Sequence, residues 1–406
     1  MVSENIMGNK IKEKARIWLT SKRYNWRNYD IALVIVVLVL SLISSYILSI
    51  LNVQNHHVGS LKRQIFTVAA GLFIIVLFSL IDYHTICTYV PLLYIVTTIL
   101  VACTRFSPLG TTLNTDSYRW LDFKVFNLQP SELCKIVVIL SLAAFFVYRR
   151  EKLQTFQTFF LACLIAFLPT SFILVQSDLS SSVVIIVVLA MMLLSSGIGR
   201  KILGPVIAVL VPVSGFLVWY IFQPNQLLLD KYQLKRITGW LNPDSQALDT
   251  MYQQNNSVLS IASGKLYGKR LLEDAAESRN YNSVSVTESD FIWTPISEEF
   301  GFIGCMVILA LLSIIIIKCF LAAKRAKDYM GMMIAIGIGS MFCFQIFFNI
   351  GVATSILPNT GLPLPFLSNG LSSLMSSSMA VGILINIGIQ PNRGSNSSFV
   401  DSLTIK

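Results

Sequence analysis

The acidic residues between positions 288 and 299 have the types and spacing that could do chemistry. Asp290 stands directly before an apolar run, and Glu298 and Glu299 follow about 12 Å further along a helix at 1.5 Å per residue. Carboxylates at a membrane surface are costly in free energy, so they require a functional explanation. A positioned carboxylate is a general base for an alcohol, which is a poor nucleophile at neutral pH.

Three further charged residues lie before or at the start of another apolar run. Arg119 lies in the polar stretch 104–130, and Pro130 suits the start of a helix that carries Glu132 and Lys135. These two residues are three positions apart, which places them on one helical face. They either neutralise each other within a helix bundle or contact substrate directly, since intramembrane charge pairs do both.

Two polar turns complete the set of candidates. Asp178 lies between two apolar runs, where it either caps a helix or binds substrate. Ser368 ends the segment 357–370, which is rich in Pro and Gly. Irregular backbone at membrane depth must be buried in protein or line a cavity. We therefore expect 357–370 to form a shaped plug or a substrate contact.

The composition specifies the elements that position these residues. Hydrophobic residues make up 54% of the chain and charged residues 13%, and the mean hydropathy is +0.67, which excludes a soluble globule. About 20 apolar residues span a bilayer as a helix. The sequence predicts an all-α polytopic membrane protein with about ten transmembrane helices, near 31–52, 63–82, 85–103, 131–148, 156–175, 180–198, 202–222, 291–318, 330–352 and 370–390.

The domain boundaries follow from this pattern. A basic segment 1–30 precedes the membrane domain 31–390, in which the large extracytoplasmic loop 223–290 joins the seventh and eighth helices. The Ser/Asn-rich tail 391–406 is expected to be disordered. The first apolar run lacks a cleavage-site pattern, so we interpret it as a retained anchor.

The basic residues predict the orientation. With ten alternating spans, the segment 1–30 and the basic groups near 149–152, 200–201 and 318–327 fall on one side, which the positive-inside rule makes cytoplasmic. Both termini are then cytoplasmic. The net charge of +10 is largely explained by these anchors, and no compact basic face with interleaved aromatic residues indicates nucleic-acid binding.

Cysteine and histidine give no metal motif. The cysteines lack CxxC spacing and lie in or beside apolar runs, so we interpret them as small core residues. His56 and His57 lie in the first external loop without nearby Cys or acidic partners, which is more typical of a solvated loop than of a metal site.

Five separated motifs resemble the signature regions of the SEDS family (shape, elongation, division and sporulation proteins), which includes RodA, FtsW and SpoVE. They occur in family order, and the resemblance covers about residues 28–392. The matching stretches are Arg119-Trp120, Gln129-Pro-Ser-Glu132 with Lys135, Gln176 with Asp178-Leu179, Asp290-Phe-Ile with Glu298-Glu299 and Gly301-Phe-Ile-Gly304, and Asn349-Ile-Gly351 through Leu357-Pro, Thr360-Gly-Leu-Pro-Leu-Pro-Phe366 and Ser368.

The resemblance implies a peptidoglycan glycosyltransferase of the bacterial cytoplasmic membrane that polymerises lipid II at the outer face. Its expected partners are a class B penicillin-binding protein, which cross-links the strands, and the undecaprenyl-pyrophosphate-linked glycan. The essential family aspartate falls on Asp290. Substrate binding is assigned to Arg119, Glu132, Lys135, Asp178, Glu298 and Ser368.

The chemistry of the implied reaction requires a single catalytic base. An α-linked sugar pyrophosphate that becomes a β-linked glycan undergoes a single inverting displacement, which requires one carboxylate. Developing charge on the pyrophosphate calls for cations, for which Arg119 and Lys135 are candidates. Mg²⁺ or Mn²⁺ bridging the diphosphate suits hard oxygen ligands, although the sequence has no dedicated metal motif.

Two other functions remain open at this stage: a lipid II flippase, and a catalytically weak scaffold for the transpeptidase. The motifs are shared by elongation, division and sporulation proteins and do not separate these roles. The sequence also departs from the usual family pattern. Glu288 replaces His, Asn282 an acidic residue, Asn369 and Leu371 a Tyr and a Gly, Ser177 a Pro, and Ser180, Lys265 and Arg270 glycines.

Overall fold

The structure is a computed structural model that describes residues 24–55, 58–111, 118–124, 127–223, 231–241, 251–271, 279–284 and 287–390. The predictions about segment 1–23, the pair His56 and His57, and the tail 391–406 lie outside the described residues.

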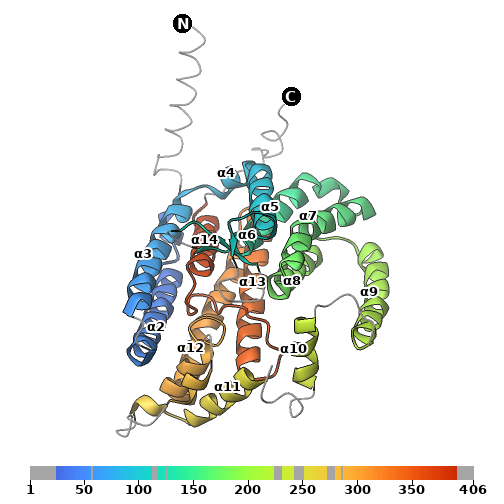
Figure 1. Ribbon diagram of the computed structural model, residues 1–406. Coiled ribbons are helices and arrows are strands. Elements are labelled where there is room, and N and C mark those ends of the chain that lie inside the picture. The colour runs from blue at the N-terminus through green and yellow to red at the C-terminus, as the bar shows by residue number, and fades with distance from the viewer. Residues whose placement is uncertain are drawn as a thin grey trace.

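Ten long apolar helices make up most of the described part of the chain (Figure 1). Eight are long and apolar enough to cross a membrane, while α5 and α8 are shorter, and each predicted span overlaps one of the ten. The helices are α2 (Ile31–Asn55), α3 (Val58–Leu80), α5 (Val90–Phe106), α6 (Pro130–Tyr148), α7 (Phe156–Val175), α8 (Leu179–Ser195), α9 (Arg200–Ile221), α12 (Trp293–Arg325), α13 (Tyr329–Ala353) and α14 (Leu371–Ile389).

Short elements connect the long helices. A small antiparallel sheet, which the prediction of an all-α fold did not include, pairs Gly110 with Leu121 and Leu121 with Leu128. It ends directly before α6 and therefore fixes the chain around Arg119. The short elements are η2 (Trp26–Asn28), α4 (Tyr83–Thr88), β1 (Gly110–Thr111), β2 (Trp120–Asp122), β3 (Asn127–Leu128), η3 (Arg150–Lys152), α10 (Lys231–Leu241), α11 (Tyr252–Ser263), η5 (Lys269–Leu271) and η6 (Asn280–Ser283).

Helices α6, α13 and α14 are the most deeply buried of the long helices, whereas α9 is almost wholly exposed. Small residues let α14 approach α3 closely: a Cβ on Gly382 would lie 2.8 Å from the carbonyl oxygen of Ile75, and one on Gly71 would lie 2.4 Å from Leu374. Lipid tails are as apolar as leucine, so close van der Waals packing stabilises helix pairs in a membrane. Ser378 of α14 takes part in the same close approach, because a Cβ on Gly71 would lie 2.8 Å from its Oγ.

The two ends of the bundle differ. The terminal face, where Asn25 N–H donates to the carbonyl of Ile389 at 2.9 Å, also carries α4 and the turn between α12 and α13. The loop face, at the opposite end in Figure 1, carries α10 and α11. Helix α11 lies within the predicted external loop 223–290. Part of the predicted external loop is thus ordered.

A hydrogen-bonded cluster holds the terminal face together. The ring nitrogens of His84 lie 2.8 Å from Asp82 Oδ1 and 2.6 Å from Asp328 Oδ2, and the Tyr83 hydroxyl donates to Asp328 Oδ1 at 2.5 Å. Burial alone would lower the pKa of His84, but the two carboxylates raise it above 6.5. Burial would raise the pKa of Asp328, but the hydrogen bonds from His84 and Tyr83 hold it below its usual range. The cluster ties α4 to the start of α13.

Helix α12 is broken at Gly301, and the external loop docks on the helix at this break. The backbone of Gly301 has φ 65° and ψ −167°, a conformation that favours glycine. The freed N–H groups of Phe302 and Ile303 donate to the carbonyls of Lys265 and Leu266 at 3.0 and 3.1 Å. A Cβ on Gly301 would lie 2.2 Å from the backbone nitrogen of Gly268. The family-like Gly301 therefore permits the loop to dock on the helix.

Candidate functional site

Backbone and side-chain hydrogen bonds fix the position of Asp290. Asn349 Nδ2 donates to the carbonyls of Asp290 and Leu362, at 2.9 and 2.7 Å, and so joins α13 to both segments. Ser368 Oγ donates to the carbonyl of Ser289 at 2.5 Å. The half-buried Asp290 is thereby held against the 357–370 segment.

The carboxylate of Asp290 and the guanidinium of Arg119 converge over Gly361. A Cβ built on Gly361 would lie 3.0 Å from Asp290 Oδ2 and 3.8 Å from Arg119 Nη1. Gly361 has φ +73°, a left-handed conformation that L side chains rarely adopt. The 357–370 segment thus presents bare backbone where the two charged groups meet, and any side chain at 361 would intrude between them.

Arg119 lies between Asp290 and the start of α8. Its Nη2 donates to the carbonyl of Ser177 at 3.0 Å, and its Nη1 lies 4.0 Å from Asp178 Oδ1. Its Nε is buried and has no hydrogen-bond partner among the described residues. Asp178 itself accepts hydrogen bonds from the backbone N–H and hydroxyl of Ser181, at 3.2 and 2.8 Å, and so caps α8. The capping interpretation of Asp178 is therefore confirmed.

A cavity of about 160 Å³ opens beside Arg119. Phe344 and Phe348 of α13 provide apolar walls, and the backbone segment 358–360 closes one side. The hydroxyl of Thr360 in its wall is a second buried polar atom that lacks a partner in the described chain. Unsatisfied buried polar atoms are rare in folded proteins, and here two of them adjoin the same cavity.

Glu132 and Lys135 form an ion pair inside the bundle. Lys135 Nζ lies 2.7 Å from Glu132 Oε1, both side chains are almost fully buried, and Ser376 of α14 donates to Glu132 Oε2 at 3.3 Å. Mutual neutralisation, one of the two interpretations of this pair, is thus observed. A direct substrate role for either residue stays a prediction.

Glu298 and Glu299 hold the external loop rather than Asp290. Both oxygens of the fully buried Glu298 carboxylate are occupied: Oε1 by Lys269 Nζ at 2.5 Å and the N–H of Asn280, Oε2 by Ser260 and the N–H of Tyr281. Glu299 Oε1 accepts from Arg279 Nε at 2.8 Å. Substrate binding by Glu298 stays a prediction, but these contacts anchor the loop.

Several departures from the family pattern take part in local contacts. Asn369 donates through its backbone N–H and its Nδ2 to the carbonyl and the carboxylate of Glu288, at 2.7 and 2.9 Å, so two unusual residues bond each other beside Asp290. Ser180 donates to the carbonyl of Thr360. Ser177 has φ 60°, which the fixed ring of proline excludes.

The structure brings together part of the predicted site. Asp290, Arg119, Asp178 and Ser368 meet where the 357–370 segment, β2 and the start of α8 converge, while no described contact joins Glu132, Lys135 or Glu298 to Asp290. Sequence reasoning missed the positioning roles of several residues, although the motif residues Asn349 and Gly361 were visible in the family-like stretches. The missed residues are Ser180, Lys269, Arg279, Tyr281, Asn349, Gly361 and Asn369.

Comparison with known proteins agrees with this architecture. Stage V sporulation protein E of Bacillus subtilis is 32% identical over 327 residues, which is 80% of this chain and 86% of that protein. Peptidoglycan glycosyltransferase MrdB of Escherichia coli K12 is 29% identical over 368 residues, 90% of this chain and 96% of that protein. A solved structure titled "Structural coordination of polymerization and crosslinking by a peptidoglycan synthase complex" has a TM-score of 0.70 at 22% identity, and the match covers 89% of this chain and 97% of that one.

These likenesses extend over the whole bundle and confirm a polytopic helical membrane protein. A model of the family of FtsW, RodA and SpoVE, described as "Cell cycle protein", matches residues 27–393, a range that contains every element of the site. The chain therefore belongs to the FtsW/RodA/SpoVE family.

Proposed function

We propose that this protein is a peptidoglycan glycosyltransferase that polymerises lipid II at the outer face of the cytoplasmic membrane. The observation that carries the proposal is the convergence of the Asp290 carboxylate and the Arg119 guanidinium over the bare backbone of Gly361. A base beside a fixed cation is what an alcohol needs to displace a phosphate leaving group. The family relative named peptidoglycan glycosyltransferase MrdB supports the same reaction.

Asp290 acts on the acceptor. The hydroxyl of one sugar donates its proton to the carboxylate of Asp290 as its oxygen forms a bond to the anomeric carbon of the other. The bond from that carbon to the lipid pyrophosphate breaks, and its electron pair leaves with the pyrophosphate. A single displacement inverts the anomeric centre from α to β. An oriented base contributes roughly 10²- to 10⁴-fold to such a rate.

Arg119 meets the developing negative charge on the leaving group. Its buried Nε and the hydroxyl of Thr360, neither of which has a hydrogen-bond partner within the described residues, provide two donors beside one cavity. Preorganised donors in a site that excludes water stabilise developing charge without reorganisation at the moment of reaction. Lys135 has a carboxylate partner in Glu132, so Arg119 is the better placed cation.

The donor set does not fit a resident metal ion held by the protein alone. Among the described residues, no group of three or more His, Cys, Asp or Glu side chains is arranged to hold one. Mg²⁺ usually binds through one or two carboxylates together with substrate phosphates. We therefore propose that Mg²⁺ or Mn²⁺, if the reaction requires it, arrives bound to the diphosphate of the substrate.

Orientation and partner complete the proposal. Basic residues of the terminal face, among them Arg27, Arg150 and Lys318, agree with a cytoplasmic location of both termini under the positive-inside rule. The loop face then lies outside, with the site near it. The similar solved structure is titled for a complex that combines polymerisation with crosslinking, which supports a class B penicillin-binding protein as the partner.

The test is reconstitution of the purified protein with lipid II, with and without a class B penicillin-binding protein and with Mg²⁺ or Mn²⁺. We compare glycan polymer formed by wild type, Asp290→Asn and Asp122→Asn. Asp122 is an exposed carboxylate in β2, so its variant removes the same charge without touching Asp290. We expect Asp290→Asn to lose at least 100-fold in rate and Asp122→Asn to keep it.

The alternative functions give different outcomes. Equal polymer from wild type and folded Asp290→Asn would contradict the assignment of the base. No polymer from wild type under any condition, while lipid II crosses the bilayer of proteoliposomes, would indicate the flippase. No polymer and no transport, with retained binding of the transpeptidase, would indicate the scaffold.

A further inference from the structure

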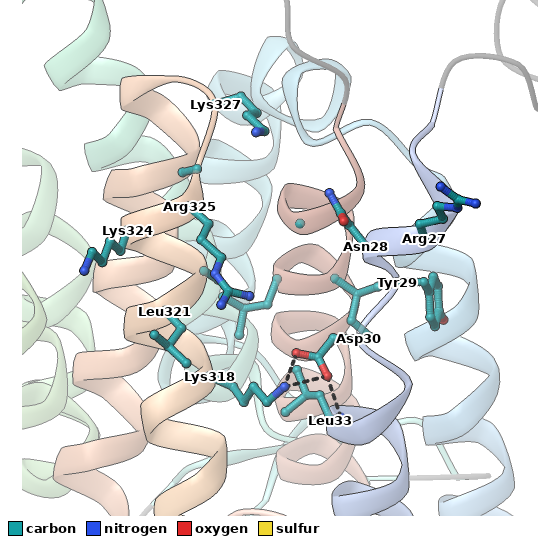
Figure 2. Close-up of a pocket in the computed structure, with 15 residues that line it drawn as sticks. Arg27, Asn28, Tyr29, Asp30, Leu33, Lys318, Leu321, Lys324, Arg325 and Lys327 are labelled. Atoms are coloured by element: carbon teal, nitrogen blue, oxygen red, sulfur yellow. Dashed lines mark hydrogen bonds and ion pairs between the residues drawn. The ribbon is translucent and has the colours of Figure 1, made fainter.

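A cavity of about 690 Å³ lies on the terminal face, between η2, the start of α2, the end of α12 and the end of α14 (Figure 2). This basic cavity is at the opposite end of the bundle from Asp290. Its lining contains five basic side chains and one acidic one: Arg27, Lys318, Lys324, Arg325, Lys327 and Asp30.

The single acidic group is already neutralised. Lys318 Nζ lies 2.8 and 3.0 Å from the two oxygens of Asp30, and Asp30 Oδ1 also accepts from the N–H of Leu33. In the described part of the chain, no carboxylate pairs with Arg27, Arg325 or the other two lysines of the lining. As far as the described residues go, the lining of the basic cavity therefore carries an uncompensated positive charge.

Figure 2 shows how these cations are arranged. Arg325 extends from α12 into the space above the Lys318–Asp30 pair, whereas Arg27 lies at the rim beyond Asn28 with its guanidinium turned away from Arg325, and Lys324 also points away. One guanidinium group, that of Arg325, thus faces the cavity, and a second cation, Arg27, lies at its rim. Guanidinium groups bind phosphate oxygens through two parallel N–H donors, which makes arginine the preferred residue for phosphate recognition.

The depth of the basic cavity matches the headgroup layer of a membrane. Seven residues separate Lys318 from Arg325, or about 10 Å of helix. The polar layer on each side of a roughly 30 Å hydrocarbon core is about 5–8 Å thick, so cations along this stretch of α12 cover its whole depth. Apolar side chains at the same level remain exposed, among them Ile31 of α2 and Ile317 and Leu321 of α12. They offer a surface for acyl chains directly beside the cations.

We propose that the basic cavity binds the phosphodiester headgroup of an anionic phospholipid, whose acyl chains lie along α2 and α12. Arg325 holds the phosphate, Arg27 at the rim adds positive charge that attracts the anionic headgroup, and Lys318 remains paired with Asp30. Basic pockets between transmembrane helices are known to bind anionic headgroups, and each basic group near an anionic lipid is worth about fivefold in affinity. The site is separate from the glycosyltransferase chemistry and does not depend on it.

The test measures lipid retention by native mass spectrometry of the purified full-length protein in mild detergent. Phosphatidylglycerol, cardiolipin and phosphatidylethanolamine are titrated separately into wild type, Arg325→Gln, Arg27→Gln and the double variant. Lys152→Gln is the matched control, because Lys152 is an exposed cation in η3 on the same face, outside the cavity. Thermal unfolding establishes that each variant is folded.

We expect wild type to retain phosphatidylglycerol or cardiolipin in preference to phosphatidylethanolamine. Each single variant should weaken that binding about fivefold and the double variant roughly 25-fold, while Lys152→Gln leaves it unchanged. Arg325→Lys keeps the charge but loses the paired N–H donors, so it should weaken binding less than Arg325→Gln, and it provides a readout if the double variant fails to fold.

Three results would overturn the proposal. The first is equal retention of all three lipids by wild type. The second is an equal loss of anionic lipid in Lys152→Gln and Arg325→Gln, which would indicate the general charge of the face. The third is displacement of the lipid by inorganic phosphate at the same concentration as lipid, which would indicate a site for free phosphate.

Discussion

Replacement of Gly361 by alanine tests whether the position of the Asp290 carboxylate matters for catalysis. The added Cβ would lie 3.0 Å from Asp290 Oδ2, whereas ordinary contacts of this kind begin at 3.4 Å. The carboxylate must therefore move by a few tenths of an ångström. A misplacement of about 1 Å costs roughly 100-fold in rate, so a shift of this size should lower polymerisation about fivefold to tenfold.

The same substitution has a separate effect on stability. Gly361 has φ +73°, and a left-handed conformation costs an L residue about 1–2 kcal/mol. Alanine also makes the unfolded chain less flexible than glycine does, which offsets about 0.4–1 kcal/mol of this cost. The net loss in the free energy of unfolding should be about 1 kcal/mol. This loss leaves the protein folded, so the rate can be measured.

The assay compares polymer formation and thermal unfolding for wild type, Gly361→Ala and Gly370→Ala. Gly370 is the matched control in the same segment, because its backbone is extended and an added Cβ would meet only Ser373 at 3.6 Å. We expect only Gly361→Ala to lose activity. Full activity of Gly361→Ala together with its lowered melting temperature would refute the argument that Asp290 is held over Gly361 to act as the base.

Three further predictions concern contacts around the site and the terminal face. Asn369→Ala removes a hydrogen bond to Glu288 beside Asp290 and should lower polymerisation several-fold with little loss of stability; Asn369→Asp should lower it more, because two carboxylates then face each other. Glu298→Gln removes the charge partner of Lys269 and should increase proteolysis of the loop at 264–284 by about tenfold. The raised pKa of His84 stabilises the fold below pH 6.5, and this stabilisation should disappear as the pH rises through the raised value; thermal unfolding from pH 6 to 9 measures it.

Each of these predictions has a control. For Asn369, the double variant with Glu288→Ala should be no worse than the single one, since the bond is already absent; an additive loss would contradict the contact. For Glu298, cleavage equal to that of wild type would contradict its role as the loop anchor. For His84, the variant His84→Gln should show a flatter pH profile, and an unchanged profile would assign the titration to another group.

The unusual residues show where sequence comparison loses information. Glu288 and Asn369 each depart from the family pattern, and in the sequence they stand 81 positions apart as separate anomalies. The structure joins them by two hydrogen bonds. Lys265 stands where the family has glycine and still adopts a positive φ of 47°. The turn therefore has the backbone conformation that suits glycine, although its residue is lysine. Pairing and backbone conformation of this kind are determined by the tertiary structure.

The prediction of ten helices follows directly from the sequence for a physical reason. Backbone polar groups inside a membrane must be satisfied within the same segment, so a long apolar run specifies a helix by itself. The capping of α8 by Asp178 and the pairing of Glu132 with Lys135 are equally local, since each spans three residues. The sequence alone therefore determined the class and the long apolar helices, whereas for Asp178 and the Glu132–Lys135 pair it offered the local contact as one of two interpretations, and the structure shows that contact.

Only the tertiary structure decided which candidates meet. Asp290 and Arg119 are separated by 170 residues of chain and converge because the backbone of Gly361 passes between their elements. Glu298 lies eight residues from Asp290, yet the break of α12 at Gly301 brings in the loop, which occupies both of its carboxylate oxygens. Sequence spacing specifies positions along one helix, but it does not specify which surfaces of different helices pack together, and that packing created the site.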